Sequence, residues 1–372
     1  MGNAAITPIT MPKWGLSMQE GKVVQWIAAV GSAVAPGDQL LDIETEKIAN
    51  TFEALEAGLL RRQVAQAEDV LPIGALLGVM APESVTEAEV EAFITEFQAN
   101  YVPPPPSEEE GGPSFQWANV GPGKIRYAKL GERGPAVILI HGFGGDLINW
   151  LFTQEPLAAS AQVFALDLPG HGQSSKTVTD ATIPGLAATL VEFMDALEIE
   201  RAHLIGHSLG GAIALHIGIS NPERVSSLSL LASAGLGPEI NGGYLSGFIK
   251  GESRRDMKPV LQQLVANPAL ITRQLIDDVL KFKRTDGVPA ALRAIAAGFV
   301  AADRQLVELR PSLAALPMPV QVLWGSRDQI ISASHAEGLP ANVHVERLEG
   351  VGHLLQMEAA SQVNTLLKRF IL

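Results

Sequence analysis

The stretch RAHLIGHSLGGAIALHIGISNP, residues 201–222, decides the fold of the longer part of this 372-residue chain. An apolar run precedes the pattern G-x-S-x-G, an apolar helical stretch follows it, and Asn221-Pro222 ends that stretch. A strand that passes through a tight turn into a helix presents a serine above a sheet, and the flanking glycines permit close approach of helix and strand. The sequence therefore predicts Ser208 as a nucleophile, with a coincidental glycine-serine turn as the alternative.

Two further segments supply partners for this serine. LWGSRDQII (323–331) places Asp328 after an apolar strand, and GVGHLLQ (350–356) contains His353, so the order along the chain is Ser, Asp, His. In that arrangement the histidine takes the serine proton, while the aspartate orients the imidazole and stabilises its charged form. Asp167 also follows a strand and could serve as the acid, but its DLPGHG turn gives it a structural explanation.

The segment ILIHGFGG (138–145) adds a third element of the predicted site. The backbone amide of Phe143, with that of Leu209, could hold the oxyanion that develops on a carbonyl under attack. The other histidines are weaker candidates for the base. His141 and His171 fall on predicted active-site loops without an acidic partner, and we expect local packing or hydrogen bonding for His203, His207 and His216.

Short apolar runs alternate with helical stretches from about residue 115 to the end, which predicts an α/β domain with a mostly parallel sheet over residues 115–372. With the serine, aspartate and histidine motifs, this part resembles the α/β-hydrolase-fold proteins. The resemblance implies a helical cap at about residues 235–312. Members of that family act on esters, thioesters and even carbon–carbon bonds, so the fold does not name the substrate.

The first 80 residues contain an internal duplication. A shift of 37 residues aligns Gly21 with Gly58 and Gly37 with Gly74, together with several apolar positions. Each copy has short alternating strands with glycine turns, which predicts two similar antiparallel sheets in a small all-β sandwich or flattened barrel. Glu68 stands where the repeat leads one to expect glycine, so we expect a reshaped turn there.

Three stretches of this part, MPKWGLSMQEGKVVQW, VAPGDQLLDIETEKI and LPIGALLGVM, resemble a lipoyl domain, which we assign to residues 1–82. The resemblance implies lipoic acid in amide linkage on a lysine at the tip of a hairpin, and Lys47 is the matching position. Biotin carriers place methionines beside the lysine, whereas Glu46 and Ile48 flank Lys47, so we expect lipoate. An ordinary surface lysine is the remaining alternative.

A helix and a linker are expected over residues 83–114. VTEAEVEAFITEFQANY has apolar residues at helical spacing, and Thr86 with Glu89 can form a capping box. The apolar stripe could dock a partner, but packing against its own domain is the simpler explanation. VPPPPSEEEGGPS combines prolines with like charges, and at about 3.1 Å per residue some fifteen residues span roughly 45 Å, enough for one domain to swing against the other.

Composition narrows the class of protein. Residues 1–110 hold 5 Lys or Arg against 17 Asp or Glu, so nearly all of the net charge of −13 lies in this part, which argues against nucleic acid and anionic membrane surfaces as partners. The chain has no cysteine, which excludes disulfides and thiolate metal sites, and we predict no metal. Neither a secretory signal nor an apolar run of membrane-spanning length is found, so we expect a cytoplasmic protein.

The whole chain resembles the dihydrolipoyl acetyltransferase components of acetoin dehydrogenase complexes, which join a lipoyl domain to an α/β-hydrolase-type domain. The resemblance implies acetyl transfer from dihydrolipoyl-Lys47 to coenzyme A, through an acyl-Ser208 or directly. It also implies three partners: a thiamine-dependent acetoin-cleaving component, dihydrolipoyl dehydrogenase and a lipoate-attaching enzyme. The H-x-x-x-D-G motif of ordinary 2-oxo acid dehydrogenase acyltransferases and their peripheral-subunit-binding module are not found, which leaves open how partner enzymes dock.

Two alternatives and one binding hypothesis remain. With water as acceptor the same residues would make a thioester or ester hydrolase, and a hydrolase-like part without activity would make a lipoyl carrier or scaffold. Coenzyme A is a polyanion, and residues 250–284 hold eight basic against four acidic side chains. We expect Arg254, Arg255 and Lys258 to meet its phosphates, although a solvated helix face would have the same composition.

Overall fold

A computed structural model describes residues 6–12, 18–45, 49–54, 56–103 and 115–371. The chain divides into two compact units, residues 1–112 and 113–372. The proline-rich spacer predicted before residue 115 falls mostly at 104–114, outside the described residues. Within the described ranges no helix has the length and apolar character needed to cross a bilayer.

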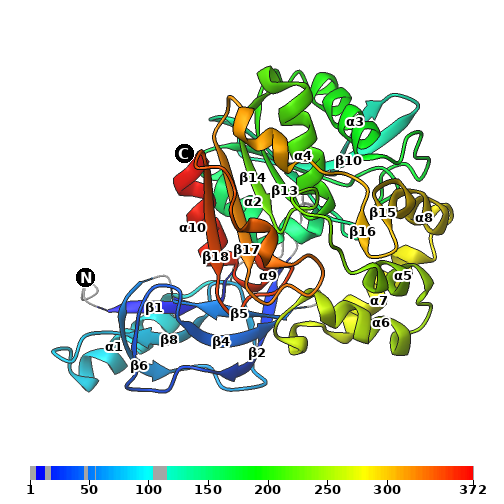
Figure 1. The fold of residues 1–372 in the computed structure, drawn as a ribbon. Coiled ribbons are helices and arrows are strands. Elements are labelled where there is room, and N and C mark those ends of the chain that lie inside the picture. The colour runs from blue at the N-terminus through cyan, green and yellow to red at the C-terminus, as the bar shows by residue number, and fades with distance from the viewer. Residues whose placement is uncertain (1–5, 13–17, 46–48, 55, 104–114, 372) are drawn as a thin grey trace. The chain divides into compact units, whose positions relative to one another are not determined.

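The first unit contains two four-stranded antiparallel sheets (Figure 1). One has the order β1 (Thr7–Thr10), β8 (Leu76–Met80), β6 (Gly58–Gln63) and β3 (Ala33–Val34), and the other has the order β5 (Ala49–Glu53), β4 (Gln39–Glu44), β2 (Glu20–Trp26) and β7 (Val70–Pro72). A shift of 37 residues relates β4 to β8, β2 to β6 and β3 to β7, and each of these pairs occupies the same place in the two sheets. The predicted duplication and all-β fold are therefore confirmed.

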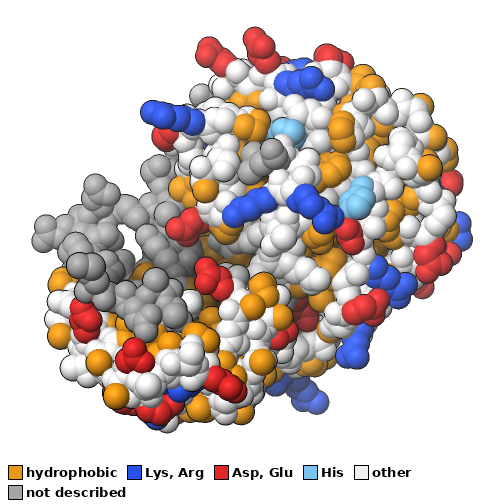
Figure 2. Space-filling model, turned by 90° about the vertical axis from the view of Figure 1, so that its left-hand side faces the viewer, with side chains coloured by type: hydrophobic (Ala, Val, Ile, Leu, Met, Phe, Trp, Pro, Cys, Tyr) orange, Lys and Arg blue, Asp and Glu red, His pale blue; other side chains and the backbone are white. Residues whose placement is uncertain are grey.

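Hydrogen bonds repeat with the same period. The amides of Ile27 and Ala28 donate to the Leu40 carbonyl at 2.9 and 3.0 Å, and those of Val64 and Ala65 donate to the Leu77 carbonyl at 2.8 and 2.9 Å. The apolar positions of both copies turn inward to one shared core, which includes Val23, Leu41, Ile43, Leu60 and Leu77. Figure 2 shows acidic side chains spread between apolar ones on the surface of this unit.

The turn at Glu68 is not reshaped, contrary to expectation. Glu68 has a φ of 74°, close to the 89° of its repeat partner Gly31. The side chain, which a glycine lacks, forms an ion pair with Lys22 at 2.7 Å. The backbone therefore keeps the left-handed conformation that glycine adopts freely and other residues adopt at a cost.

Helix α1 (Glu87–Asn100) packs against the first unit. Its N-terminus has the predicted capping box, in which the Thr86 amide donates to the Glu89 carboxylate at 2.8 Å. Val90 and Ile94 are buried against Leu76 and other residues of this unit. The apolar stripe of the helix thus completes its own domain.

The second unit has one eight-stranded sheet, with the order β18 (Val343–Leu348), β17 (Val320–Gly325), β14 (Val225–Leu231), β13 (Ala202–His207), β11 (Ala136–Ile140), β12 (Gln162–Leu166), β10 (Gly123–Leu130) and β9 (Phe115–Val120). The six strands from β18 to β12 are parallel, and β10 pairs antiparallel with both β12 and β9. The predicted mostly parallel α/β sheet is confirmed.

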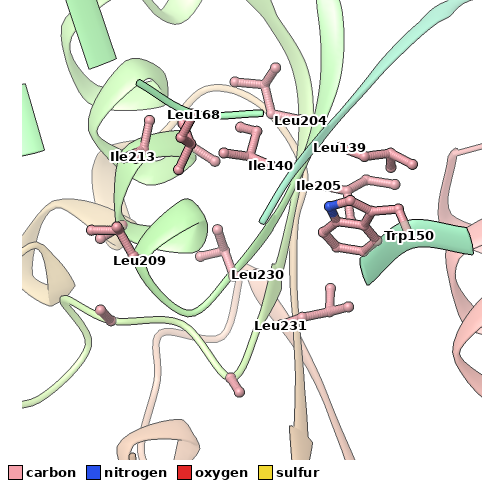
Figure 3. Close-up of a cluster of buried hydrophobic side chains, with 14 of the residues drawn as sticks. Leu139, Ile140, Trp150, Leu168, Leu204, Ile205, Leu209, Ile213, Leu230 and Leu231 are labelled. Atoms are coloured by element: carbon pink, nitrogen blue, oxygen red, sulfur yellow. The ribbon is translucent and has the colours of Figure 1, made fainter. Parts of the chain in front are cut away.

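Helices flank this sheet (Figure 1). Those outside the region between β14 and β17 are α2 (Leu151–Ala158), α3 (Ile183–Ala196), α4 (Leu209–Ser220), α9 (Leu355–Glu358) and α10 (Ala360–Ile371), with short 3-10 turns η1 (Leu147–Trp150), η2 (Pro222–Arg224) and η6 (Ala333–Ala336). Helix α3 packs beside α4, and α10 packs beside α2. The central strands are thereby buried on both faces, which explains their continuous apolar runs. Figure 3 shows Leu139, Ile205 and Leu231 of these strands together with Trp150 in that core.

The region between β14 and β17, residues 232–319, is here named the helical insert. It contains α5 (Gly242–Lys250), α6 (Arg254–Leu261), α7 (Arg273–Lys283) and α8 (Val288–Phe299), the short strands β15 (Val300–Ala301) and β16 (Arg304–Gln305), and the 3-10 turns η3 (Gln262–Leu264), η4 (Pro268–Leu270) and η5 (Arg310–Ala315). Its helices bury apolar faces into the core of the second unit. They lie where the sequence leads us to expect a cap.

Candidate active site

Ser208 occupies a strained turn between β13 and α4. Its φ of 53° and ψ of −117° are unusual for a residue with a side chain. The Ser208 amide donates to the Leu231 carbonyl at 2.9 Å, and the Ser208 carbonyl accepts from the Ala234 amide at 3.0 Å. The end of the neighbouring strand β14 thus holds the turn in place.

The two motif glycines have the role predicted for them. A Cβ atom on Gly206 would lie 2.3 Å from the Gly210 carbonyl oxygen, and a Cβ atom on Gly210 would lie 2.2 Å from the Ile140 carbonyl oxygen. Neither position has room for a side chain, because the obstructing atoms belong to the backbone. Helix α4 can therefore approach the sheet closely only with glycine at both positions.

His353 and Asp328 form a buried pair. His353 Nδ1 lies 2.7 Å from an Asp328 carboxylate oxygen, and both side chains are almost fully buried. The other Asp328 oxygen accepts from the amides of Ile330 and Ile331 at 2.8 and 3.0 Å. These bonds orient the carboxylate, so Nδ1 carries the donated proton and Nε2 is the basic nitrogen.

The sheet topology brings these residues to one edge. Ser208, Asp328 and His353 follow the carboxyl ends of β13, β17 and β18, which run parallel. The His353 ring packs against the ring of His207, the residue before Ser208, with centroids 4.6 Å apart. The predicted nucleophile, acid and base thus share one site at this edge.

The loop after β11 lies against the serine. A Cβ atom on Gly142 would be 3.1 Å from the Ser208 Cβ atom. Among the described residues, neither the Phe143 amide nor the Leu209 amide has a hydrogen-bond acceptor. Two unpaired donors beside the serine suit the stabilisation of an oxyanion.

Two buried histidines hold this loop through hydrogen bonds to backbone groups. His141 donates from Nδ1 to the Gly142 carbonyl at 2.7 Å and accepts from the Leu168 amide at 2.9 Å. His171 accepts from the Gly144 amide at 3.1 Å. Burial lowers the pKa of His141 to about 4 and, with the nearby His141, the pKa of His171 to about 3. Both are therefore neutral near pH 7 and bound to backbone groups.

Local packing or hydrogen bonding is expected for His203, His207 and His216. His203 contacts the Ser227 hydroxyl at 2.7 Å, and His207 Nε2 donates to the His353 carbonyl at 2.9 Å. Burial lowers the pKa of His216. None of them pairs with a carboxylate among the contacts of the described residues.

Asp167, the alternative acid, is engaged in folding the loops. One carboxylate oxygen accepts from the Leu147 amide at 2.9 Å, and the other accepts from the Gln173 amide at 2.7 Å and lies 3.6 Å from Arg126. Its side chain is fully buried. The carboxylate connects three segments and does not contact His353.

Some basic side chains of the helical insert bond other residues of the insert, and others have no such contact among the described residues. Arg254 pairs with Asp277 of α7, with Nη2 2.6 Å from the carboxylate, and Lys283 is buried with its ammonium donating to the Gly251 carbonyl. Burial lowers the pKa of Lys283. Arg255 and Lys258 are exposed on α6. A count of charges from the sequence alone does not reveal this division.

An aromatic group surrounds Phe143 that no motif of the sequence indicates. The Phe143 ring lies 5.8 Å from Phe248 of α5 and 6.3 Å from Phe299 of α8, measured between centroids. Phe282 of α7 stacks on His171. Aromatic residues on the apolar faces of insert helices were the available signal, but such residues pack in any core.

Comparison with known proteins agrees with these two folds. Residues 135–360 match the family described as alpha/beta hydrolase fold, and residues 7–80 match the family described as Biotin-requiring enzyme. A dihydrolipoyllysine-residue acetyltransferase component of the acetoin cleaving system from Pseudomonas putida is 48% identical, over 98% of each chain. The component of the same name from Cupriavidus necator is 45% identical, over 98% of this chain and 97% of that protein.

The chain belongs to this family of acetoin-system acetyltransferase components. A solved meta-cleavage product hydrolase from Pseudomonas fluorescens shares the fold of the second unit, with a TM-score of 0.63 and 24% identity over 68% of this chain and 96% of that chain. The chain joins a lipoyl-type unit to an α/β-hydrolase-fold unit.

Lys47, the predicted attachment residue of this family member, lies outside the described residues. The flanking strands β4 and β5 are antiparallel neighbours that pair Glu44 with Ala49. The described strands on either side of Lys47 in the sequence are therefore hydrogen-bonded neighbours, as the resemblance to a lipoyl domain leads us to expect. The Asp42 carboxylate of β4 accepts from the Thr51 hydroxyl of β5 at 2.6 Å and ties the two strands together.

Proposed function

We propose that this chain transfers an acetyl group from a lipoyl thioester at Lys47 to the thiol of coenzyme A, with Ser208, His353 and Asp328 as catalytic residues. The observation that carries the proposal is the 2.7 Å contact between His353 and Asp328, on the sheet edge where Ser208 adopts its strained turn. The acetyltransferase name of full-length relatives supports the choice of reaction.

The first half-reaction forms an acyl-serine. The Ser208 oxygen attacks the thioester carbonyl while His353 Nε2 takes the hydroxyl proton, and Asp328 stabilises the imidazolium. The amides of Phe143 and Leu209 hold the oxyanion. The carbon–sulfur bond then breaks, and His353 returns the proton to the departing thiol.

The second half-reaction reverses these roles. The coenzyme A thiol gives its proton to His353 and attacks the acyl-serine carbonyl, and the same two amides hold the oxyanion again. Ser208 leaves and recovers the proton from His353. A direct attack of the thiol on the thioester remains the alternative, and a rapid-quench experiment without coenzyme A separates the two, because only the first route accumulates acetyl-Ser208.

Lipoate would be held in amide linkage on Lys47, and it would supply a thiol that carries the acetyl group. In this scheme the acetyl group comes from a thiamine-dependent acetoin-cleaving component, and a dihydrolipoyl dehydrogenase reoxidises the dithiol. A lipoate-attaching enzyme modifies Lys47 beforehand. Mass analysis of the Lys47 peptide distinguishes lipoyl, biotinyl and unmodified lysine.

The exposed cations of α6 would bind the acceptor. Arg255 and Lys258 lie three residues apart on one helix and are free to meet phosphates, whereas Arg254 already has Asp277 as its partner and orients α6 against α7. Reversing both charges should raise the KM for coenzyme A about tenfold and leave kcat unchanged. Lys281→Glu on α7 is the matched control, since that lysine is also exposed on the insert. An unchanged KM would remove these residues from the site.

The test of the whole function uses acetyl-dihydrolipoamide with coenzyme A and measures acetyl-CoA and free acetate together. We expect acetyl-CoA, and we expect Ser208→Ala to lower kcat by at least about a thousandfold. The control is Ser246→Ala, which changes an exposed serine of α5. Acetate alone would favour the hydrolase, and full activity of Ser208→Ala would favour a non-catalytic carrier.

A further inference from the structure

The backbone at His353 is held from two sides. On one side the His353 carbonyl accepts from His207 at 2.9 Å. On the other side the next amide, that of Leu354, donates to the Leu264 carbonyl of the helical insert at 3.0 Å. The position of the histidine therefore depends on both the sheet and the insert.

A single carboxylate reinforces the contact with the insert. Glu358 ends the short helix α9, and one of its oxygens accepts from the amides of Ala266 and Asn267 at 2.7 and 3.1 Å. The other oxygen accepts from the amide of Gly352, the residue before His353, at 2.6 Å. One side chain thus joins the connection between η3 and η4 of the insert to the histidine loop.

The two segments meet too closely for any side chain to lie between them. A Cβ atom on Gly352 would lie 2.7 Å from the Ala266 nitrogen and 2.8 Å from the Glu358 carboxylate. The carboxylate is mostly buried, and burial is the main cause that raises the pKa of Glu358, while its three backbone donors lower it and the nearby Asp328 charge raises it further. The position of this charge close to the Asp328 and His353 pair is therefore electrostatically costly, and hydrogen bonds offset the cost.

We propose that Glu358 is a positioning residue that fixes His353 relative to the helical insert and adds a negative charge beside the base. The proposal rests on the proposed role of His353 as the base. The titratable groups around this histidine are Asp328, which bonds its ring, and His207, which packs on it, while Glu358 accepts from the amide of the residue before it. A residue that acts only on folding stability would not change the pH dependence of the reaction.

The test compares Glu358→Gln and Glu358→Ala in the full lipoylated chain. The glutamine variant keeps the shape and one acceptor oxygen but removes the charge, so it stays informative if the alanine variant folds poorly. Glu349→Gln is the matched control, because Glu349 precedes the same loop but its side chain is 82% exposed and lies 3.7 Å from Arg347. Hydrogen exchange at the amides of Ala266, Asn267 and Gly352 reports whether their bonds to the Glu358 carboxylate are kept. The pH profile of kcat reports the protonation of His353.

We expect faster exchange at the three amides in the alanine variant and a kcat about ten- to a hundredfold lower, with KM for both substrates within about twofold. We expect the acid limb of the pH profile to move to lower pH in the glutamine variant, because a nearby negative charge stabilises the imidazolium. Glu349→Gln should match the wild type in both measurements.

Three outcomes would overturn the proposal: unchanged exchange, unchanged kcat despite faster exchange, or a lower kcat with an unmoved acid limb. The same variants are also compared in the hydrolysis of an activated acetyl ester, which tests the role of Glu358 independently of coenzyme A. That reaction uses the same histidine and serine without coenzyme A. A chain that fails to make acetyl-CoA but shows the predicted Glu358 effects on ester hydrolysis would contradict the acetyltransferase function and support the positioning role.

Discussion

Replacing Gly210 with alanine should displace Ser208 and abolish most of the activity. The added Cβ atom would lie 2.2 Å from the Ile140 carbonyl oxygen and 2.6 Å from the His141 carbonyl oxygen. Both obstacles are backbone atoms, so no side-chain rotation can relieve the clash. Either α4 or the loop after β11 has to move, and these two segments supply the Leu209 and Phe143 amides of the proposed oxyanion site.

The size of the effect follows from the distances. Ordinary contacts begin at 3.4 Å, so the clash requires a shift of about 1 Å. A misplacement of that size at a catalytic site costs on the order of a hundredfold in rate. Overpacking should also lower the free energy of unfolding by about 1–3 kcal/mol, partly offset by the roughly 1 kcal/mol that alanine gains over glycine within a helix.

The assay pairs the rate of acetyl transfer with calorimetric unfolding of the same preparation. Gly218→Ala is the matched control on the same helix, because its Cβ atom would meet Leu228 Cδ1 at 2.8 Å, the terminal carbon of a side chain that can rotate. The control should keep the wild-type rate and lose no stability. A Gly210→Ala chain with kcat within about twofold of wild type would refute the reasoning that close helix–sheet approach positions the serine.

The remaining predictions concern stability. Gly31→Ala should destabilise the first unit by about 1 kcal/mol and lower its Tm by about 4–8 °C, and because nothing lies within 4 Å of the added Cβ atom, an unchanged Tm would mean that its φ of 89° carries no cost. Thr86→Ala should cost about 1 kcal/mol in urea unfolding through loss of the α1 cap, whereas a cap of no importance would leave the midpoint unchanged. His141 has a folded pKa of about 4, below its unfolded value of 6.5, so its stabilising contribution is complete above the unfolded value and falls as the pH drops toward the folded one. When the pH is lowered from about 8 to about 5, the free energy of unfolding should fall by about 2 kcal/mol less in His141→Gln than in the wild type. An equal fall in both proteins would contradict the assignment of a buried neutral imidazole.

The candidate site was largely predictable because its chemistry is tied to local sequence. Each motif is only a few residues long: a serine between two glycines, an aspartate after an apolar strand, and a histidine after another. Parallel strands then bring Ser208, Asp328 and His353 to the same edge without any knowledge of long-range packing. The duplication of the first unit was predictable for a similar reason, because the two copies have turns and apolar positions in the same places.

Features that depend on pairs of residues distant in sequence were not predictable. Ala266 and Glu358 are 92 residues apart, and no local pattern marks either as the partner of the other. Lys283 is one of eight basic residues in a charged stretch, yet its ammonium is buried against Gly251. At Glu68 the sequence showed the departure from glycine, but only the backbone reveals that the turn accepts a positive φ and gains an ion pair with Lys22.

The surroundings of the oxyanion loop explain how a Ser–His–Asp site could favour a thiol over water in the proposed reaction. A Cβ atom on Gly144 would lie 2.5 Å from the Phe248 ring, so that ring packs directly on the loop, and Phe143 and Phe299 are buried beside it. Apolar walls offer water no hydrogen-bond partners, whereas a weakly hydrated thiol loses little on entering and becomes a strong nucleophile once His353 removes its proton. The tethered donor does not need selection of this kind, because attachment to the same chain already raises its local concentration. In the proposed reaction, selection of the acceptor would therefore depend on the helical insert, which supplies both aromatic rings beside the oxyanion loop and the exposed cations of α6.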